Sequence, residues 1–322
     1  MKERENINKK PLIILTGPTA VGKTQLSLRL AHDIGCEIIS ADSMQVYRRM
    51  DIGSAKILPE QRQGIRHHLI DCREPEEDFH VAEFQRAAKQ AMEMIYAAGK
   101  IPLIVGGTGF YIQALLRDID FSEGDMDQAY RSELEALARE KGTEQLHEML
   151  RRVDPKSAEA IHPNNVKRVI RALEYFRETK EPISLHNEEQ REKSSPYNFA
   201  YFVLDLPREL LYERIDARVD EMLRDGLEQE VRALWQSGCH RGMVSMQGLG
   251  YKEMLAYLEG ELTLEQAVYL IKRDTRHFAK RQLTWFKREE QVIRLRKDEY
   301  VDEDELLAAM IKILREKGII SI

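Results

Sequence analysis

An eight-residue glycine motif near the start of the chain limits its possible folds to a small number. The motif reads G-x-x-x-x-G-K-T and comprises Gly17, Pro18, Thr19, Ala20, Val21, Gly22, Lys23 and Thr24. An apolar run at 11–16 precedes it and a helix-forming segment at 25–31 follows it, which places the motif at a strand-to-helix junction. In such a loop backbone N–H groups converge on phosphate oxygens, and the helix N-terminus adds positive potential. The motif therefore predicts a phosphate-binding P-loop, with Lys23 as a point charge and Thr24 as a ligand of Mg²⁺.

The length and composition indicate a soluble globular protein with more than one part. At 322 residues the chain exceeds a typical single domain, so we expect two domains or one domain with a large insertion. Hydrophobic residues make up 43% and charged residues 32%, and no apolar run is long enough to cross a bilayer, so we predict no transmembrane helix. The polar segment 1–10 has no apolar stretch and is interpreted as a short tail, not a signal peptide.

The cysteines indicate the cellular compartment. Cys36, Cys72 and Cys239 are scattered, odd in number and without C-x-x-C spacing. This pattern argues against disulfides and against a zinc site. We therefore expect a protein of the reducing cytoplasm.

Charge is unevenly distributed along the chain. The formal net charge is −6, which by itself discourages binding to nucleic acid. Residues 272–288, however, hold seven Lys or Arg residues and one acidic residue. A local basic face of this kind can bind a phosphate backbone on a protein that is acidic overall.

Strands and helices alternate through much of the chain. A short buried strand is predicted within 37–43 and ends near Asp42, and a second strand at 101–105 runs into another glycine loop at 106–109. Apolar positions between 81 and 95 predict the helix that connects them. A strand at 200–205 and a helix after Pro207 resume the pattern. This alternation indicates βαβ units and an α/β fold, with a P-loop NTPase-like parallel sheet flanked by helices.

Between the two halves of this pattern the sequence predicts helices only. The segment 119–198 carries helical apolar spacing and a helix-start signal at Asp154-Pro155. We interpret 119–198 as an inserted all-helical domain, with 1–118 and 199–322 forming a discontinuous core. The charged segment 298–322 is predicted to be a solvated terminal helix.

Several motifs occur together in one order. They are the P-loop, S-A-D-S-M-Q-V-Y-R at 40–48, M-D-I-G-S-A-K at 50–56, V-G-G-T-G at 105–109 and A-K-R-Q-L-T-W-F at 279–286. In this combination the sequence resembles the bacterial tRNA dimethylallyltransferases, P-loop prenyltransferases of the tRNA isopentenyltransferase family. The resemblance extends over residues 12–288, and the second and last motifs are much more specific than the P-loop.

The resemblance implies a reaction and a donor site. A dimethylallyl group would pass from dimethylallyl diphosphate to the exocyclic amine of the adenosine 3′ of the anticodon in tRNA, and diphosphate would be released. The P-loop would hold the donor's diphosphate, whose charge Lys23, Mg²⁺ on Thr24 and Arg218 would neutralise. Arg214 is a helper in this scheme. Both arginines could instead form surface ion pairs with acidic residues of their own helix, namely Asp216, Asp220 and Glu221.

Asp42 is the predicted general base. The adenine amine is a poor nucleophile, so a carboxylate that accepts its proton as the new bond forms assists the reaction. The same aspartate could instead cap the structure that begins at Ser43. The target base must leave its stack to reach the allylic carbon. The resemblance implies a base channel lined by Asp42, Ser43, Met44, Gln45, Thr108, Gln247 and Gly248, although Thr108 could serve only its own glycine turn.

Two segments are predicted to hold the rest of the tRNA. In the insertion, which by resemblance contacts the anticodon stem, the residues are Arg131, Val166, Lys167, Arg168, Val169, Ile170 and Arg171. In the basic segment the residues that would contact phosphates are Arg276, Lys280, Arg281 and Arg288. Charge runs of this kind also occur as solvated faces.

Other function classes fit parts of the sequence. A small-molecule kinase would transfer the γ-phosphate of ATP and use the insertion as a lid. An adenylate prenyltransferase would modify free AMP and would leave the insertion and the basic segment without a role. A non-enzymatic RNA-binding adaptor fits least, because the P-loop and Asp42 are both intact. The predicted partners are dimethylallyl diphosphate and the tRNA anticodon stem-loop, with no membrane and with the protein as a monomer.

Overall fold

The computed structural model describes residues 9–121 and 127–321, and most of the predicted N-terminal tail lies outside them. The chain forms two compact units, Met1–Leu116 with Pro196–Ile322 and Arg117–Ser195. The insertion thus starts two residues and ends three residues before the predicted boundaries. Its end is earlier because the next strand begins at Tyr197, three residues before the strand predicted at 200–205.

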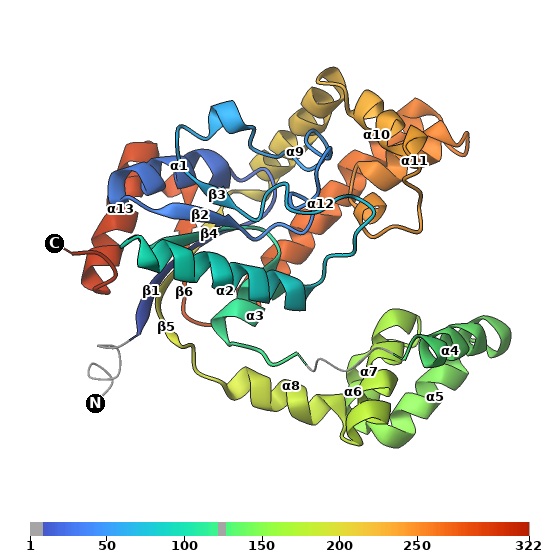
Figure 1. Ribbon diagram of the computed structural model, residues 1–322. Coiled ribbons are helices and arrows are strands. Elements are labelled where there is room, and N and C mark those ends of the chain that lie inside the picture. The colour runs from blue at the N-terminus through green and yellow to red at the C-terminus, as the bar shows by residue number, and fades with distance from the viewer. Residues whose placement is uncertain (1–8, 122–126, 322) are drawn as a thin grey trace. The chain divides into compact units, whose positions relative to one another are not determined.

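A six-stranded sheet forms the centre of the described part of the first unit (Figure 1). The strands are β1 (Lys10–Thr16), β2 (Glu37–Ser40), β3 (His67–His68), β4 (Pro102–Gly106), β5 (Tyr197–Asp205) and β6 (Val292–Arg296). Their order is β3-β2-β4-β1-β5-β6, every pair is parallel, and Ile13 of β1 pairs with both Leu103 and Ala200. The predicted α/β fold with a parallel sheet is confirmed. Parallel strands bring their carboxyl ends to one edge, where ligands bind in sheets of this class.

Helices cover both faces of the sheet, which explains why its strands are apolar on both sides (Figure 1). The helices of this unit are α1 (Lys23–Ile34), α2 (Val81–Ala97), α3 (Gly109–Leu116), α9 (Arg208–Arg224), α10 (Leu227–Gln236), α11 (Tyr251–Leu258), α12 (Leu264–Arg288) and α13 (Glu303–Glu316). Ile13 and Leu15 of β1 pack in one cluster with α1 and α13, while Leu12 and Ile14 pack in another with α2, α3 and α11. Within 9–121 and 127–321, no helix is both long enough and apolar enough to cross a membrane.

The C-terminal region differs from the sequence prediction. The sequence predicts a solvated helix within 298–322. The helix is present as α13, but the prediction that it is solvated is wrong, because α13 buries Leu306, Met310 and Leu314 in the cluster that includes α1. Apolar residues at helical spacing give α13 one packed face and one charged face. The strand pattern does not predict the two edge strands, since β3 has two residues and β6 alternates apolar residues with Arg294 and Arg296.

The second unit has its own apolar core. Its described helices are α4 (Gln128–Lys141), α5 (Thr143–Val153), α6 (Pro155–Ala160), α7 (Val166–Thr179) and α8 (Ile183–Glu192). Leu134, Leu146, Leu150, Val169 and Leu173 meet in one buried cluster. The insertion therefore does not depend on the sheet for the burial of these residues.

Asp154 fastens two helices of the insertion. Its carboxylate accepts hydrogen bonds from the N–H groups of Ser157 and Ser184, at 2.9 and 3.0 Å, and from both serine hydroxyls, each at 2.7 Å. Burial raises the pKa of Asp154, but the four hydrogen bonds outweigh burial and hold that pKa below its usual value. The ionised side chain is thus the N-cap of α6 and also the anchor of the first turn of α8.

Candidate active site

The P-loop connects β1 to α1 at the carboxyl edge of the sheet. Gly17 has a φ of +147°, and a Cβ at this position would lie 2.5 Å from the carbonyl oxygen of Leu204 on β5. A side chain is therefore excluded here. Thr16 joins the adjacent strand end, because its hydroxyl donates a 2.6 Å hydrogen bond to the carbonyl oxygen of Gly106. At the other end of the loop α1 begins at Lys23, so the unpaired N–H groups of its first turn belong to the loop.

Lys23 lies over its own loop. Its ammonium group donates hydrogen bonds to the carbonyl oxygens of Gly17, at 3.0 Å, and Pro18, at 2.8 Å. Burial lowers the pKa of Lys23 to about 8, the Asp42 carboxylate opposes this shift, and the Arg218 guanidinium adds to it. A polyanion bound in the loop would favour the charged form of this lysine.

Arg218 of α9 approaches the same place from another element. Burial lowers the pKa of Arg218, while the carboxylates of Glu221 and Asp42 raise it. Among the residues described, no group forms an ion pair with its guanidinium. Two of the acidic residues that could have paired with Arg218 on the protein surface are instead paired with cations of α12. These pairs are Asp216–Arg276 and Asp220–Lys272. Arg218 is thus a half-buried cation within electrostatic reach of both Lys23 and Asp42.

Asp42 follows β2 at this edge. Its Oδ1 accepts hydrogen bonds from the N–H groups of Met44, at 2.8 Å, and Gln45, at 3.4 Å. In the described ranges no group donates a hydrogen bond to its Oδ2. The two interpretations of Asp42 are therefore compatible, because one oxygen caps the turn while the other can accept a proton.

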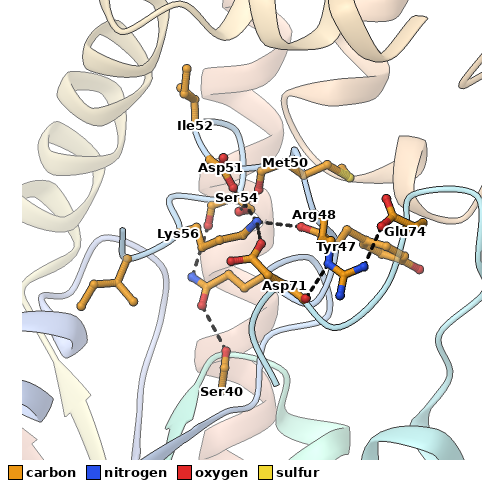
Figure 2. Close-up of polar contacts among 12 residues, drawn as sticks. Ser40, Tyr47, Arg48, Met50, Asp51, Ile52, Ser54, Lys56, Asp71 and Glu74 are labelled. Carbon is orange, nitrogen blue, oxygen red and sulfur yellow. Dashed lines mark hydrogen bonds and ion pairs between the residues drawn. The ribbon is translucent and has the colours of Figure 1, made fainter. Parts of the chain in front are cut away.

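A buried lysine fixes the loop that follows Asp42 (Figure 2). The Lys56 side chain is 1% exposed, and its Nζ donates to the carbonyl oxygen of Tyr47 at 2.7 Å. The same Nζ contacts the carboxylates of Asp51 and Asp71, each at 2.6 Å. One cation therefore joins three points of the chain between residues 47 and 71.

A carboxylate from α10 holds the same loop from another side. Glu230 accepts hydrogen bonds from three consecutive N–H groups, those of Asp51 and Ile52 at 2.8 Å and of Gly53 at 3.0 Å. It also accepts a 2.7 Å hydrogen bond from the Tyr251 hydroxyl. The Tyr251 ring leaves no room beside Gly53, where a Cβ would lie 2.6 Å from it. Residues 51–53 belong to the loop that follows Asp42, and Tyr251 directly follows residues 247–250, so Glu230 connects two segments that continue from predicted base-channel residues.

The predicted base-channel residues lie near one another, but some of their side chains bind within the protein. The Ser40 hydroxyl donates to the Gln45 side-chain carbonyl at 3.1 Å. The Gln247 amide donates to a backbone carbonyl six residues earlier in the chain. Met44 packs on Gly248, where a Cβ would lie 2.6 Å from the terminal carbon of Met44. The side chains of Gln45 and Gln247 therefore stabilise the conformations of their own loops through hydrogen bonds. The contact between Met44 and Gly248 packs these two loops against each other.

The remaining channel residues lie at the ends of β2 and β4. The Thr108 N–H donates to the carbonyl oxygen of Ala41 at 3.2 Å, and its own carbonyl accepts from the first turn of α3. The side chains of Thr108 and Ser43 are half-buried and form no hydrogen bond with the described residues. The turn role suggested for Thr108 is therefore performed by its backbone, which leaves the hydroxyl unused.

The basic segment divides into a paired and an unpaired part. Arg276 binds both carboxylate oxygens of Asp216, at 2.5 and 2.7 Å, so its guanidinium is engaged within the protein and its phosphate contact stays a prediction. Further along α12, a hollow of about 470 Å³ is lined by His277, Lys280, Arg281, Thr284, Trp285 and Arg288. The three cations of this hollow form no ion pair with any described residue.

In the insertion only part of the predicted tRNA surface is accessible. The Arg131 guanidinium forms two hydrogen bonds of 2.8 Å with the carboxylate of Glu174, which places it in a structural ion pair. Val169 and Ile170 are 0% and 3% exposed in the helical core, so their predicted side-chain contact with RNA is corrected. Arg131 keeps 28% of its side chain exposed, and the other residues that remain at least partly exposed are Val166, Lys167, Arg168 and Arg171. Arg214 of α9 is likewise exposed.

Thr24 is the residue best placed to hold a divalent cation at the P-loop. It is exposed in the first turn of α1. Across 9–121 and 127–321, no three His, Cys, Asp or Glu side chains gather in a metal site. The donors present fit Mg²⁺, because this ion commonly takes one or two protein oxygens together with substrate phosphates and water.

Three residues of this region have no predicted role, namely Lys56, Glu230 and Gln282. Lys56 belongs to the M-D-I-G-S-A-K motif, where a lysine among small and apolar residues is a signal of a buried cation. Glu230 lies in an ordinary amphipathic helix and carries no local signal. Gln282 links segments more than 170 residues apart in sequence, which only the folded chain reveals.

The comparisons with known proteins agree with this geometry. The family model described as IPP transferase matches residues 45–289, which is more than half of the chain. This chain belongs to the IPP transferase family. The relationship predicted from the motifs is thereby confirmed.

Relatives of this IPP transferase align over nearly all of its length. A tRNA dimethylallyltransferase of Lachnoclostridium phytofermentans is 63% identical over 311 residues, covering 97% of this chain and 99% of the relative. The full-length tRNA isopentenylpyrophosphate transferase of Bacillus halodurans is 44% identical with a TM-score of 0.72, covering 96% and 97% of the two chains. A eukaryotic dimethylallyltransferase acting on tRNA has a TM-score of 0.81 at 29% identity, covering 96% of this chain and 80% of the other.

Proposed function

We propose that this IPP transferase moves a dimethylallyl group from dimethylallyl diphosphate to the exocyclic amine of the adenosine 3′ of the anticodon in tRNA. The names of its relatives support the class of acceptor and of transferred group. The observation that carries the proposal is that Lys23, Asp42 and Arg218 lie within electrostatic reach of one another. Two cations at a glycine loop suit a diphosphate, and the adjacent carboxylate suits proton removal from an amine.

The donor half of the reaction uses the cations. The bond between the allylic carbon and the diphosphate oxygen breaks, and its electron pair stays on the diphosphate. The loop N–H groups, Lys23 and Arg218 are positioned to stabilise the negative charge that develops, and one such donor contributes about 2.7–4 kcal/mol. Bound Mg²⁺ on Thr24 would add to this neutralisation.

The acceptor half uses Asp42. The adenine nitrogen forms the new bond to the allylic carbon and loses one proton, which passes to the carboxylate. Oδ1 of Asp42 is engaged by the turn at Met44, so Oδ2 is the oxygen that takes the proton. The products are the N-alkylated adenosine, diphosphate and a proton that Asp42 returns to water. The base reaches this point by leaving its stack, between Met44 and Thr108.

The exposed cations supply the contact with RNA phosphates in this proposal. They are Lys280, Arg281 and Arg288 on α12, and Lys167, Arg168 and the partly exposed Arg171 in the insertion. Such contacts fix the position of the RNA and make its affinity depend on salt. One chain contains both glycine loops and the three central charges, so we propose that a monomer acts. The three unpaired cysteines support a cytoplasmic location.

Transfer of a label tests the proposal. The protein is incubated with dimethylallyl diphosphate labelled in the prenyl group, Mg²⁺ and unmodified tRNA, with free AMP and ATP in parallel reactions. We expect label on the adenosine 3′ of the anticodon, one diphosphate released per modified base, and no phosphoryl transfer from ATP. Label on AMP alone, or phosphoryl transfer from ATP to an acceptor, would overturn the proposal.

A further inference from the structure

Gln282 joins the two glycine loops through one side-chain amide. Its Oε1 accepts a 2.9 Å hydrogen bond from the N–H of Thr19 in the P-loop. Its Nε2 donates a 2.9 Å hydrogen bond to the carbonyl oxygen of Gly107 in the second glycine loop. The residue is 6% exposed, so water does not replace these partners readily. Both ends of the amide are therefore committed to backbone groups of loops that follow adjacent strands.

The surroundings leave little freedom for this amide. A Cβ at Gly107 would lie 2.3 Å from the Gln282 Nε2, so the second loop approaches the amide closely because it has no side chain there. Two residues later, Gly109 is covered by the Trp285 ring, one turn further along α12. The amide orientation follows from chemistry, since Thr19 N–H requires an acceptor and the Gly107 carbonyl requires a donor.

The position of Gln282 on α12 connects these loops to the basic hollow. Its neighbours Lys280 and Arg281 line the hollow and are exposed. The same turn of helix thus has cations on its outer side and Gln282 on its inner side. A shift of this turn would displace the amide that binds both Thr19 and Gly107.

We infer that Gln282 is a positioning residue that sets the separation between the donor loop at 17–24 and the acceptor loop at 106–109. The inference rests on the proposed function, in which the P-loop holds the prenyl diphosphate and Thr108 stands beside the adenine. Gln282 touches neither reacting group in this account. It acts through the backbone of Thr19 and Gly107, and it ties that spacing to the helix that faces RNA.

Positioning of this kind affects the reaction more than it affects the binding of either substrate alone. Each loop can still hold its own ligand when the connecting amide is removed. The distance between the allylic carbon and the amine would change, and a misplacement of about 1 Å can lower a rate about 100-fold. The expected signature is therefore a lower rate of transfer with nearly unchanged binary affinities.

Three variants test the inference. Gln282→Met keeps the length of the side chain and removes both hydrogen bonds, while Gln282→Glu keeps the acceptor for Thr19 N–H and removes the donor to Gly107. Gln266→Met is the matched control, because Gln266 lies in the first turn of the same helix, where its side-chain carbonyl accepts from the N–H of Thr263. Each variant is assayed below its unfolding temperature for single-turnover transfer to tRNA. Affinities for dimethylallyl diphosphate and for an anticodon stem-loop are measured separately.

We expect a slower transfer step in both Gln282 variants, by about 10- to 100-fold in Gln282→Met. Both binary affinities should stay within about threefold of the unaltered protein, and Gln266→Met should transfer at the unaltered rate. Transfer by Gln282→Met at the unaltered rate would overturn the inference and leave the proposed function intact. Loss of both binary affinities in both Gln282 variants would also overturn it, because the role would then be structural. Absence of transfer by the unaltered protein is a different result and would overturn the proposed function itself.

Discussion

The carboxyl edge of the sheet and the helical insertion both contain buried charged groups, but these groups bind different parts of the protein. At the sheet edge, Lys56 and Glu230 bind the backbone of loops that are themselves proposed to face the substrates. In the insertion, Asp154 and Glu174 bind helix ends and a neighbouring arginine, while separate exposed cations are proposed to meet RNA. A buried anchor at the sheet edge should therefore affect chemistry and stability together. A buried anchor in the insertion should affect stability alone.

Asp42 gives the largest expected effect, because it is an anchor and a reacting group at once. Asp42→Asn retains an oxygen that can cap the turn at Met44 and Gln45 but cannot take the proton. We expect transfer to fall by about 10²–10⁴-fold, with an unchanged unfolding temperature. Single-turnover transfer and thermal unfolding measure the two effects. The control Asp42→Ala should lose the cap as well and unfold at a lower temperature, and unaltered transfer by Asp42→Asn would refute the assignment of the base.

Lys56 tests whether an anchor at the sheet edge acts on chemistry. Lys56→Met leaves Asp51 and Asp71 facing each other without their shared cation. We expect a loss of about 2–3 kcal/mol in the free energy of unfolding, less than for a fully buried pair because both carboxylates also reach water. Transfer should fall as well at temperatures where the variant is folded. Chemical denaturation and transfer assays provide the measurements.

A surface lysine is the control for Lys56. Lys10 pairs with Glu93 at 2.8 Å, but both side chains are more than half exposed, so Lys10→Met should change the free energy of unfolding by about 0–1 kcal/mol. If Lys56→Met were destabilised but transferred at the unaltered rate per folded molecule, the proposed difference between the two regions would be wrong.

Asp154 provides the corresponding test in the insertion. Asp154→Asn removes the charge that accepts four hydrogen bonds, and we expect a loss of about 1–3 kcal/mol at neutral pH. The folded-state pKa of Asp154 is lowered, so its stabilisation is fully present above the unfolded pKa of about 3.9. That stabilisation is lost as pH falls through the folded pKa. The free energies of unfolding of the unaltered protein and Asp154→Asn should therefore differ at pH 7 and converge below pH ~4. A difference at pH 3 equal to that at pH 7 would show that the charge of Asp154 is not the cause.

Lys23 links donor binding to pH. Because burial lowers its pKa to about 8, the ammonium loses its charge above that pH in the free protein. The affinity for dimethylallyl diphosphate should then fall as pH rises through 8, by up to about tenfold per pH unit. Lys23→Arg keeps its charge and should show no such fall. Calorimetric titration between pH 7 and 10 measures this, and a constant affinity of the unaltered protein would count against a role for Lys23 in binding.

The smallest effects are expected from the exposed cations of the insertion. Lys167→Gln and Arg168→Gln should each reduce the slope of log affinity for tRNA against log salt concentration by about 0.7–0.9. Arg131→Gln breaks the pair with Glu174, so it should lower the unfolding temperature and leave that slope unchanged. Filter binding at several salt concentrations compares them. If the Arg131 variant lost as much slope as the Lys167 and Arg168 variants, Arg131 would be shown to contact RNA phosphates.

Much of the sheet follows from local sequence pattern. The apolar runs before Gly17 and Gly106 are buried on both faces, so they stand out as strands between polar segments, and the carboxyl ends of parallel strands place Asp42 near the P-loop. The same apolar pattern does not predict the edge strands, because β3 has only two residues and β6 carries arginines. The spacing of Leu306, Met310 and Leu314 indicates the packed face of α13, but the many charged residues around them favour a solvated helix.

The site could be predicted only where residues act near their own place in the chain. The P-loop and Asp42 belong to short motifs and are adjacent to the strands that position them. Gln282 and Glu230 act over 263 and 179 residues of chain, and no local pattern specifies such pairings. Side-chain pairing has the same limit, since the sequence does not show that Arg131 pairs with Glu174 in another helix while Lys167 stays exposed.

The most direct test of the account is the identity of the ligand in the P-loop. Crystals of the protein soaked with an equal mixture of ATP and a non-reactive analogue of dimethylallyl diphosphate, in the presence of Mg²⁺, would reveal it. We predict the diphosphate of the analogue at residues 17–24, within reach of Lys23 and Arg218, with its allylic carbon toward Asp42. ATP alone in that loop, with its γ-phosphate directed at a phosphoryl acceptor, would contradict the central claim.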